Sequence, residues 1–398
     1  MSISPTITSK PSGLKSSGIS IGTRTGPRQP NAPADNLISH HRIQEIVRSP
    51  SVLLLPHGYP DTTPERAVVE GASCRFVDGD SINKAELLTE MANADAVLVR
   101  WTNVDAATIQ QLNRCQVLVR YGAGYDNVDL AAATTKGIVV SYVPEYCIDE
   151  VSTHAISLLL ASIRRLREVH NRVAAGKWEP NPPETLYRLR GRTLGIVGLG
   201  NIGREVARKL STWGVRILAF DPYITTVKHA DSSVKLVDLR TLCADSDYIT
   251  LHQPLLPETR HFCDASFFAA CKRRPIFINT ARGPLVDEKA LLHALSSGMV
   301  SAAALDVFEN EPLPSSSPLN HHPKIILSDH MAWYSEESHE ELRTTAAKNA
   351  LALLQGRLPP AIANPSVLGS LSHLPAWPGN PQSRWRERRD ERPYVRTL

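Results

Sequence analysis

Long apolar runs are missing from this sequence of 398 residues, and none approaches the roughly 18 residues that a membrane-spanning helix needs. The composition therefore predicts a soluble protein. A strong excess of one charge is also missing, because 44 Lys and Arg residues face 40 Asp and Glu residues, a formal net charge of +4. So small a charge does not indicate a nucleic-acid-binding surface. The length suggests two domains of ordinary size.

Cysteine is scarce, and no two cysteines form a CxxC pair. This spacing argues against a zinc site and against a disulfide framework, so we expect no metal centre. Isolated thiols fit the reduced core of a cytosolic protein or of a nuclear one. The six cysteines are Cys74, Cys115, Cys147, Cys243, Cys263 and Cys271.

The two ends differ in composition from the middle. Residues 1–45 are rich in Ser, Thr, Pro and Gly and have no acid before Asp35, which predicts a disordered N-terminal extension. A mitochondrial presequence is the alternative, but prolines would interrupt the amphipathic helix that it needs. Residues 366–398 predict a flexible basic tail in which arginines alternate with Trp377, Trp385 and Tyr394. Such a tail could contact nucleic acid or an acidic partner, although its mixed charges favour a solvated segment.

Between the ends, short aliphatic strands alternate with helical patterns, which is typical of parallel sheets covered by helices. A first series predicts strands at 52–55, 96–99, 117–119 and 138–140. A second series predicts six strands, enough for a dinucleotide-binding sheet, at 194–197, 217–220, 248–251, 276–279, 302–305 and 325–327.

Helical patterns link the two series. Apolar residues recur at helical spacing over 149–175 and predict one long helix, followed by a crossover linker at 176–183. A last helical pattern at 336–354 follows the second sheet and must pack elsewhere, and the first series is the nearest incomplete partner. We therefore expect a first domain of residues 46–148 and 335–365, a second domain of 149–334 inserted in it, and an active cleft between them.

The second series opens with the run GIVGLGNIG at 195–203, in which an apolar strand leads into GxGxxG and then into a helical pattern. Glycine permits the tight turn at Gly198, the approach of the backbone to a pyrophosphate at Gly200, and close helix-on-strand packing at Gly203. The helix that begins there directs free N–H groups at the phosphates. This setting predicts a dinucleotide site.

The next predicted strand ends at Asp221, about 20 residues beyond the glycines, where the dinucleotide fingerprint has an acid. A carboxylate there can accept both ribose hydroxyls and would repel the 2′-phosphate of NADP. The predicted cofactor is therefore NAD, although Lys228 and His229 are close in sequence and favour the phosphate. The alternative is that Asp221 only begins a turn with Pro222.

Three polar residues follow successive strands of the second series. Arg282 has a planar guanidinium that can grip a carboxylate bidentately while it polarises a carbonyl. A carboxylate such as Glu311 would hold His330 as an imidazolium, which can give a proton to a carbonyl oxygen. Singly, these residues fit a surface ion pair, a loop acid and a core histidine. Together at one edge of one sheet, they indicate an active site.

These features resemble those of the D-isomer-specific 2-hydroxyacid dehydrogenases over about residues 50–365. The matching stretches are VRYGAGYDNVD at 119–129, the glycine loop, NTARG at 279–283, ALDVFENEP at 304–312, and His330. The resemblance implies an α/β fold of two doubly wound parallel-sheet domains, a Rossmann NAD domain inserted in a flavodoxin-like substrate domain, with a cleft between. It also implies that Arg282, Glu311 and His330 are the catalytic residues.

The resemblance extends the cofactor site beyond the glycines and Asp221, to residues near the nicotinamide and in the loop from Gln253 to Thr259. The residues predicted to bind the cofactor are Ala123, Gly198, Gly200, Asn201, Ile202, Gly203, Asp221, Pro254, Thr259, Thr280, Ala281, Arg282, Asp306 and His330.

Four residues are predicted on the substrate side. Arg100 and Arg120, with Gly122 beside them, suit a second anionic group, unless Arg100 pairs with a local acid. The segment HMAWYSE at 330–336 resembles the C-terminal-binding protein branch, in which the residue at Trp333 packs against the substrate. That match implies an apolar or thioether 2-oxo acid. Asp329 departs from the family, many of whose members have proline there.

The sequence thus predicts NAD-dependent reduction of a 2-oxo acid to a D-2-hydroxy acid, or the reverse, with His330 as proton donor, Glu311 as its partner and Arg282 as substrate anchor. The alternative is an NAD(H)-sensing transcriptional co-regulator of the C-terminal-binding protein type, with protein partners. Family members commonly dimerise, so a homodimer is expected. The predicted location is the cytoplasm, or the nucleus, rather than the mitochondrion.

Overall fold

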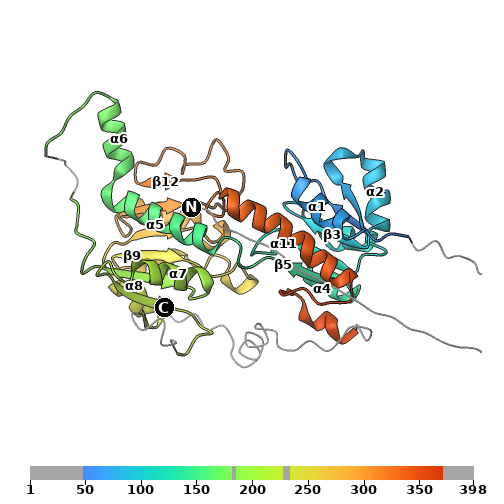
Figure 1. Ribbon diagram of the computed structural model, residues 1–398. Helices are drawn as coiled ribbons and strands as arrows, with labels where there is room; N and C mark the ends of the chain where they lie inside the picture. Colours follow the sequence, from blue (N-terminus) through green and yellow to red (C-terminus); the bar gives the residue numbers. More distant parts are fainter. Residues whose placement is uncertain (1–47, 182–184, 227–233, 371–398) are drawn as a thin grey trace, which may run out of the picture. The chain divides into compact units, whose positions relative to one another are not determined.

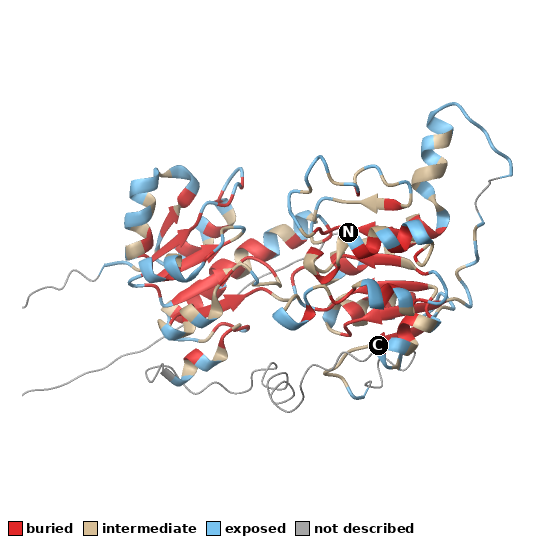
Figure 2. Ribbon diagram, turned by 180° about the vertical axis from the view of Figure 1, so that it is seen from behind, coloured by how far each residue is buried: buried red, intermediate tan, exposed pale blue. Residues whose placement is uncertain are grey.

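The computed structural model describes residues 48–181, 185–226 and 234–370 (Figure 1). The predicted N-terminal extension, Lys228 and His229, and residues 371–398 of the predicted tail lie outside these residues. The predicted start of the tail at residue 366 is wrong, because Pro365–Ser370 forms a 3-10 helix in which Val367 is buried. The described chain forms two sheets in which all strand pairs are parallel. Figure 2 shows the most buried residues running along these sheets. None of the described helices is long and apolar enough to cross a membrane.

The first sheet has the strand order β2-β1-β3-β4-β5. Its strands β1 and β3 are fully buried and aliphatic except for Ser51, as expected for a sheet covered on both faces. The sequence did not predict β2, because Arg75 and Asp78 leave it only two apolar residues. The bounds are β1 Ser51–Leu54, β2 Arg75–Asp78, β3 Ala96–Val99, β4 Val117–Arg120 and β5 Val139–Tyr142.

The second sheet has seven strands in the order β12-β11-β10-β9-β6-β7-β8. The prediction of six strands was wrong by one, because β8 contains only Val-Lys-Leu and carries no periodic signal. The bounds are β6 Thr193–Val197, β7 Arg216–Phe220, β8 Val234–Leu236, β9 Tyr248–Leu251, β10 Ile276–Asn279, β11 Ala302–Leu305 and β12 Ile325–Leu327.

Helices connect most of the parallel strands, and acidic or amide side chains cap several helix starts. Asn83, Asp105 and Asp129 each accept a backbone N–H from the first turn that follows, as does Asp287. The helices are α1 Thr63–Gly71, α2 Lys84–Asn93, α3 Ala106–Gln111, α4 Leu130–Thr135, α5 Ile148–Arg164, α6 Leu166–Ala174, α7 Asn201–Leu210, α8 Leu239–Asp245, α9 Ala265–Ala270, α10 Glu288–Ser297 and α11 Glu336–Leu354.

The single long helix predicted over 149–175 is wrong, because α5 ends and α6 begins at Arg165. This residue has φ 50° and ψ 42°, the left-handed conformation that terminates helices. Its backbone N–H still bonds to Ala161, which closes the last turn of α5. Helix α5 packs against α7 and β10, whereas α6 contains no buried residue. Packing therefore holds only the first part of the predicted helix against the sheet.

Helix α11 packs on the first sheet, although it follows the second in the sequence. It contacts α1, β3 and β4, and small residues such as Ala346 and Ala350 are fully buried there (Figure 1). A buried ion pair joins Arg343 of α11 to Glu65 of α1 at 2.7 Å, and the Tyr121 hydroxyl donates to Glu65 at 3.1 Å. Removing one partner would leave a buried charge unpaired, so this pair ties α11 to the first sheet.

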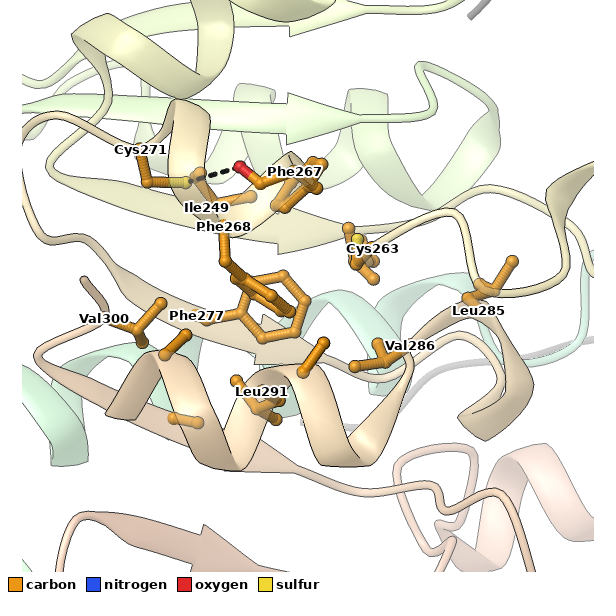
Figure 3. Close-up of a cluster of buried hydrophobic side chains, with 14 of the residues drawn as sticks. Ile249, Cys263, Phe267, Phe268, Cys271, Phe277, Leu285, Val286, Leu291 and Val300 are labelled. Carbon is orange, nitrogen blue, oxygen red and sulfur yellow. Dashed lines mark hydrogen bonds between the residues drawn. The ribbon is translucent and has the colours of Figure 1, made fainter. Parts of the chain in front are cut away.

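One core of the second sheet is rich in phenylalanine. Phe267 and Phe268 of α9 pack against Phe277 of β10 with ring centroids 6.2 and 5.4 Å apart (Figure 3). Cys263 and Cys271 lie in the same cluster, and the Cys271 thiol donates to the Phe267 carbonyl. This packing supports the face of the sheet opposite α5 and α7.

Candidate active site

A cavity of about 400 Å³ is lined by residues that follow strands of both sheets. In the first sheet, the loop after β3 contributes Arg100 and the end of β4 contributes Arg120. In the second sheet, loops after β10 and β12 contribute Arg282 and His330. The carboxyl ends of parallel strands are where open α/β sheets bind ligands. The predicted cleft is therefore present in the described residues.

The glycine loop has the geometry that a pyrophosphate site requires. Gly198 has φ 91°, and a Cβ there would lie 2.6 Å from the Gln253 nitrogen. A Cβ at Gly203 would lie 2.2 Å from the Gly198 oxygen, so only glycine at position 203 lets the helix pack this closely on the loop. Space is open beside Gly200, where a Cβ would meet no atom within 4 Å. Helix α7 begins there without a side-chain cap, which leaves its first N–H groups for an anion.

Asp221 follows β7 and is tied to the glycine loop. Its Oδ2 accepts the Leu199 N–H at 2.9 Å and its Oδ1 accepts the Tyr223 N–H at 2.9 Å. Each carboxylate oxygen keeps a further lone pair that can accept a ribose hydroxyl. The acid is thus fixed beside the loop, as the dinucleotide fingerprint requires.

Two buried polar atoms support the fit of a bound group. Thr280 and Gln253 both line the cavity, and Thr280 Oγ1 and Gln253 Nε2 have no hydrogen-bond partner among the described residues. Buried polar groups rarely stay unpaired, so a ligand that supplies partners is expected. The cavity is also lined by the predicted cofactor residues Ala123, Asn201, Ile202, Pro254, Ala281 and Asp306.

Thr259 lies elsewhere. It does not line the cavity, and its hydroxyl accepts the Leu256 N–H at 2.7 Å and donates to the Pro254 carbonyl at 2.9 Å. Its side chain therefore shapes the loop that carries Pro254.

His330 and Glu311 form a close pair, with Nδ1 and Oε2 separated by 2.6 Å. The other carboxylate oxygen of Glu311 accepts the Phe308 N–H at 2.9 Å. Burial alone would raise the pKa of Glu311, but the hydrogen bond and charge of His330 outweigh it and lower that pKa. The carboxylate holds Nδ1 as a donor, so Nε2 is left for another partner.

Asp306 holds the backbone that carries His330. The carboxylate is buried and accepts the Ser328 hydroxyl at 2.6 Å and the N–H groups of Met331 and Ala332 at 3.1 and 3.0 Å. Burial would raise the pKa of Asp306, yet these bonds and the one from His154 lower it. His330 itself has φ 58°, a conformation that a non-glycine residue adopts only under such support.

Arg100 and Arg120 line the substrate side. Arg100 donates to the His57 carbonyl at 2.7 Å and lies 4.0 Å over the Tyr59 ring. Within the described ranges, no carboxylate pairs with it, so the local-acid alternative is not observed. Burial and the charge of Arg282 lower the pKa of Arg120 to about 10. Gly122 does not line the cavity, but a Cβ there would lie 2.0 Å from Arg120 Nη1.

Aromatic residues complete this side, and one was missed. Trp333 lines the cavity as expected and packs against Tyr146 at 6.3 Å between ring centroids. Trp101 also lines it, with a side chain about half exposed and a ring 5.7 Å from that of His330. The strand-end argument used for the second sheet would have found Trp101 if applied to β3.

His57, Asp78 and Asp80 form a potential metal-ligand group next to this region, with ligand atoms within 4.8 Å of one another. His57 Nδ1 accepts the Tyr59 N–H at 2.9 Å, so Nε2 carries the proton and donates to Asp78 at 3.1 Å. The group is therefore a hydrogen-bonded cluster that fixes the His57 carbonyl to which Arg100 donates.

Known proteins match this chain in sequence and in fold. Residues 156–332 match the family described as D-isomer specific 2-hydroxyacid dehydrogenase, NAD binding domain. The chain is 37% identical over 291 residues to a glyoxylate reductase of Thermofilum pendens, a match covering 72% of this chain and 86% of that protein. It is 37% identical over 285 residues to a D-3-phosphoglycerate dehydrogenase of Methanocaldococcus jannaschii, covering 71% of this chain and 54% of that protein.

A solved structure has a similar fold. The crystal structure of a glyoxylate reductase from Paecilomyes thermophila is similar with a TM-score of 0.71 and 30% identity, covering 79% of this chain and 98% of that one. The chain therefore belongs to the D-isomer-specific 2-hydroxyacid dehydrogenase family. It is an NAD-dependent oxidoreductase of that family, and the predictions of a two-sheet parallel α/β fold and of NAD as cofactor are confirmed.

Proposed function

We propose that this protein reduces a 2-oxo acid to a D-2-hydroxy acid, or catalyses the reverse reaction, with Arg282, Glu311 and His330 at the reacting group. The observation that carries the proposal is that His330, whose Nδ1 lies 2.6 Å from Glu311, lines the same cavity as Arg282. A proton donor and a carboxylate anchor are the two functions that reduction of a 2-oxo acid requires from the protein.

Each residue has a defined task in this proposal. NAD(H), when bound along the glycine loop, supplies or accepts the hydride at C2. Arg282 binds the substrate carboxylate and polarises the adjacent carbonyl through its guanidinium. His330 donates a proton to the carbonyl oxygen from Nε2, while Glu311 holds Nδ1 and stabilises the imidazolium. Asp306 fixes the loop in which His330 lies.

The substrate class is suggested by the residues opposite the reacting group. Arg100 and Arg120 favour an acid with a second anionic group, as in the 3-phosphoglycerate named for one relative, whereas Trp333 favours an apolar or thioether side chain. The glyoxylate named for other relatives carries neither. A substrate panel must therefore include all three kinds.

Domain organisation and assembly are part of the proposal. We assign residues 46–148 and 335–365 to the substrate-binding domain and 149–334 to the NAD-binding domain, since α11 packs on β3, β4 and β5. The protein is further proposed to be a homodimer, because members of the family that it resembles commonly dimerise. Support comes from α6, which carries exposed Leu166 and Val173 and no buried residue.

The test is NADH oxidation by the purified protein with glyoxylate, hydroxypyruvate, a branched 2-oxo acid and a thioether 2-oxo acid, and NAD reduction with D-3-phosphoglycerate. Turnover of at least one, with the D-enantiomer as the product where the product is chiral, is expected. NADH binding without turnover of any panel member would contradict the enzymatic proposal and favour the NAD(H)-sensing co-regulator.

A further inference from the structure

Asp126 and Arg282 come from different sheets and meet at the cavity. Asp126 lies in the loop after β4, Arg282 follows β10, and Asp126 Oδ1 accepts a hydrogen bond from Arg282 Nε at 3.1 Å. Arg282 Nη1 donates to the carbonyl of Ala281 at 2.7 Å. Within the part of the chain that the structure describes, Nη2 donates no hydrogen bond. Nε and Nη1 are thus each held by a protein acceptor, while Nη2 is left to meet an acid at the Nη1–Nη2 edge.

Glycine makes room for this orientation. A Cβ at Gly124 would lie 1.8 Å from Arg282 Nη2 and 2.8 Å from Cζ, so any side chain there would displace the guanidinium. Asp126 Oδ1 lies 2.9 Å from the same Cβ position of residue 124, so the loop packs closely around the Arg282 side chain. The loop after β4 therefore provides both the space and the hydrogen-bond acceptor for Arg282.

Arg282 also needs a counter-charge. Burial and the charge of Arg282 together lower the pKa of Arg120 to about 10, so the two guanidinium groups repel each other across this loop. Burial would raise the pKa of Asp126, but the charge and hydrogen bond of Arg282 outweigh burial and lower it. Asp126 thus stays ionised beside Arg282 and offsets that repulsion.

We propose that Asp126 is a positioning residue for Arg282, whose hydrogen bond to Nε turns the free edge of the guanidinium toward the substrate carboxylate. This inference rests on the proposed function, in which Arg282 anchors the acid. Anchoring by a bidentate arginine depends on its orientation, so a guanidinium held before the substrate arrives binds it better than a mobile one.

A purely electrostatic role for Asp126 predicts the opposite effect on binding. Its negative charge lies beside a site for an anion, so removing that charge alone should tighten the binding of an acid. Loss of binding on removing the whole carboxylate would therefore report loss of orientation. Asn keeps the Oδ1 acceptor without the charge and separates the two effects.

The experiment measures the binding of oxamate, an unreactive analogue of a 2-oxo acid, to the protein–NADH complex by calorimetry. The side chain of Asp126 is 42% exposed, so solvent moderates its interaction with Arg282. We expect Asp126→Ala to weaken oxamate binding at least about fivefold, with NADH affinity unchanged. Asp126→Asn is expected to bind within about twofold of wild type or more tightly. Gly124→Ala should also weaken oxamate binding, with Asp126 intact.

The matched control is Glu90→Ala, which removes a carboxylate paired with Arg75 at the first sheet but outside the cavity, and should leave oxamate binding unchanged. Asp126→Ala that binds oxamate as tightly as wild type, or more tightly, overturns the inference alone. A wild type that binds NADH but neither binds oxamate nor reduces any 2-oxo acid overturns the proposed function, and the inference with it.

Discussion

The pair of His330 and Glu311 predicts how activity depends on pH. Glu311 stays ionised to below the ordinary carboxyl range, because the hydrogen bond and charge of His330 outweigh burial and lower its pKa. The carboxylate should therefore hold His330 over the whole neutral range, and kcat/KM for reduction should fall on the acid side only as Glu311 takes up a proton. In Glu311→Gln this acid limb should disappear, and kcat/KM at neutral pH should fall at least about tenfold.

The control is Asp329→Asn. Asp329 is adjacent to His330 in the sequence, but it is exposed, and no hydrogen bond joins the two side chains in the described residues. Asp329→Asn should keep the acid limb and a value of kcat/KM close to that of wild type. A wild-type profile of kcat/KM in Glu311→Gln would show that Glu311 does not support the proton donor.

Trp101 should limit the size of the acid. Its ring lies beside His330, and Arg100 lies 5.2 Å over it, so the indole occupies the mouth of the substrate side. In Trp101→Ala, kcat/KM should rise for bulky 2-oxo acids relative to glyoxylate, while Trp101→Phe should keep the wild-type order. Trp213→Ala, at an exposed tryptophan that does not line the cavity, should not alter the ratio. A ratio unchanged in Trp101→Ala would exclude this role.

The sequence predicted which site residues lie close together when those residues follow strands of one sheet. Arg282, Glu311 and His330 follow successive strands, so their proximity follows from the order of that sheet, and their roles stay predictions. Asp126 and Arg282 are separated by 156 residues and meet only because loops of two sheets face one cavity. No local pattern encodes such a contact.

Within one element, the glycine loop, Gly200 is expected to serve cofactor binding and Gly198 to serve stability. Gly200 has φ −76° and open space around it, so Gly200→Ala should fold normally, yet its methyl group would occupy the space for the pyrophosphate. We expect NADH affinity to fall about tenfold with thermal stability unchanged. Gly198→Ala should instead lose about 1–3 kcal/mol of unfolding free energy, because φ is positive and the backbone of Gln253 is too close.

The measurements are NADH titration by fluorescence and urea unfolding of each variant. Gly58→Ala is the control that separates the effect of a positive φ from that of close contacts. Gly58 also has a positive φ, but a Cβ there meets no atom within 4 Å and the residue is outside the cavity. Wild-type NADH affinity in Gly200→Ala would contradict the placement of the cofactor along this loop.

Element boundaries followed the sequence where periodicity and packing agree. The pattern at 336–354 matches α11 at both ends, because its N-cap at Ser335 and its buried face are local features. The pattern at 149–175 did not stop at Arg165, because the residues beyond it are also compatible with a helix. Helix α5 ends where Arg165 takes the left-handed conformation and where the buried residues stop, and the sequence pattern shows neither.

At the scale of the molecule, the proposed homodimer should cover the region around α6. Val173 and Trp178 are 48% and 81% exposed, and an apolar surface of this kind marks an interface. Sedimentation should give twice the mass of the chain for wild type and a smaller species for Val173→Glu combined with Trp178→Glu. Leu88→Glu, which replaces an exposed leucine of α2, should remain a dimer. A monomeric wild type would contradict the proposal.

The two-sheet fold was predicted because aliphatic strands alternate with helical patterns along the whole core. The short edge strands β2 and β8 were not, since Arg75–Asp78 and Val234–Leu236 contain too few apolar residues to stand out. Their pairing depends on the neighbouring strands β1 and β7, which are already in place. Edge strands are therefore products of tertiary structure more than of local pattern.

The central claim is that His330 is the proton donor of a 2-oxo acid reductase. The most direct measurement is single-turnover oxidation of NADH by wild type and His330→Gln with the best acid of the panel, with NADH and oxamate affinities measured on both. The account predicts a loss of at least about a hundredfold in the rate, with both affinities retained within a few fold. Equal rates in the two proteins would contradict it.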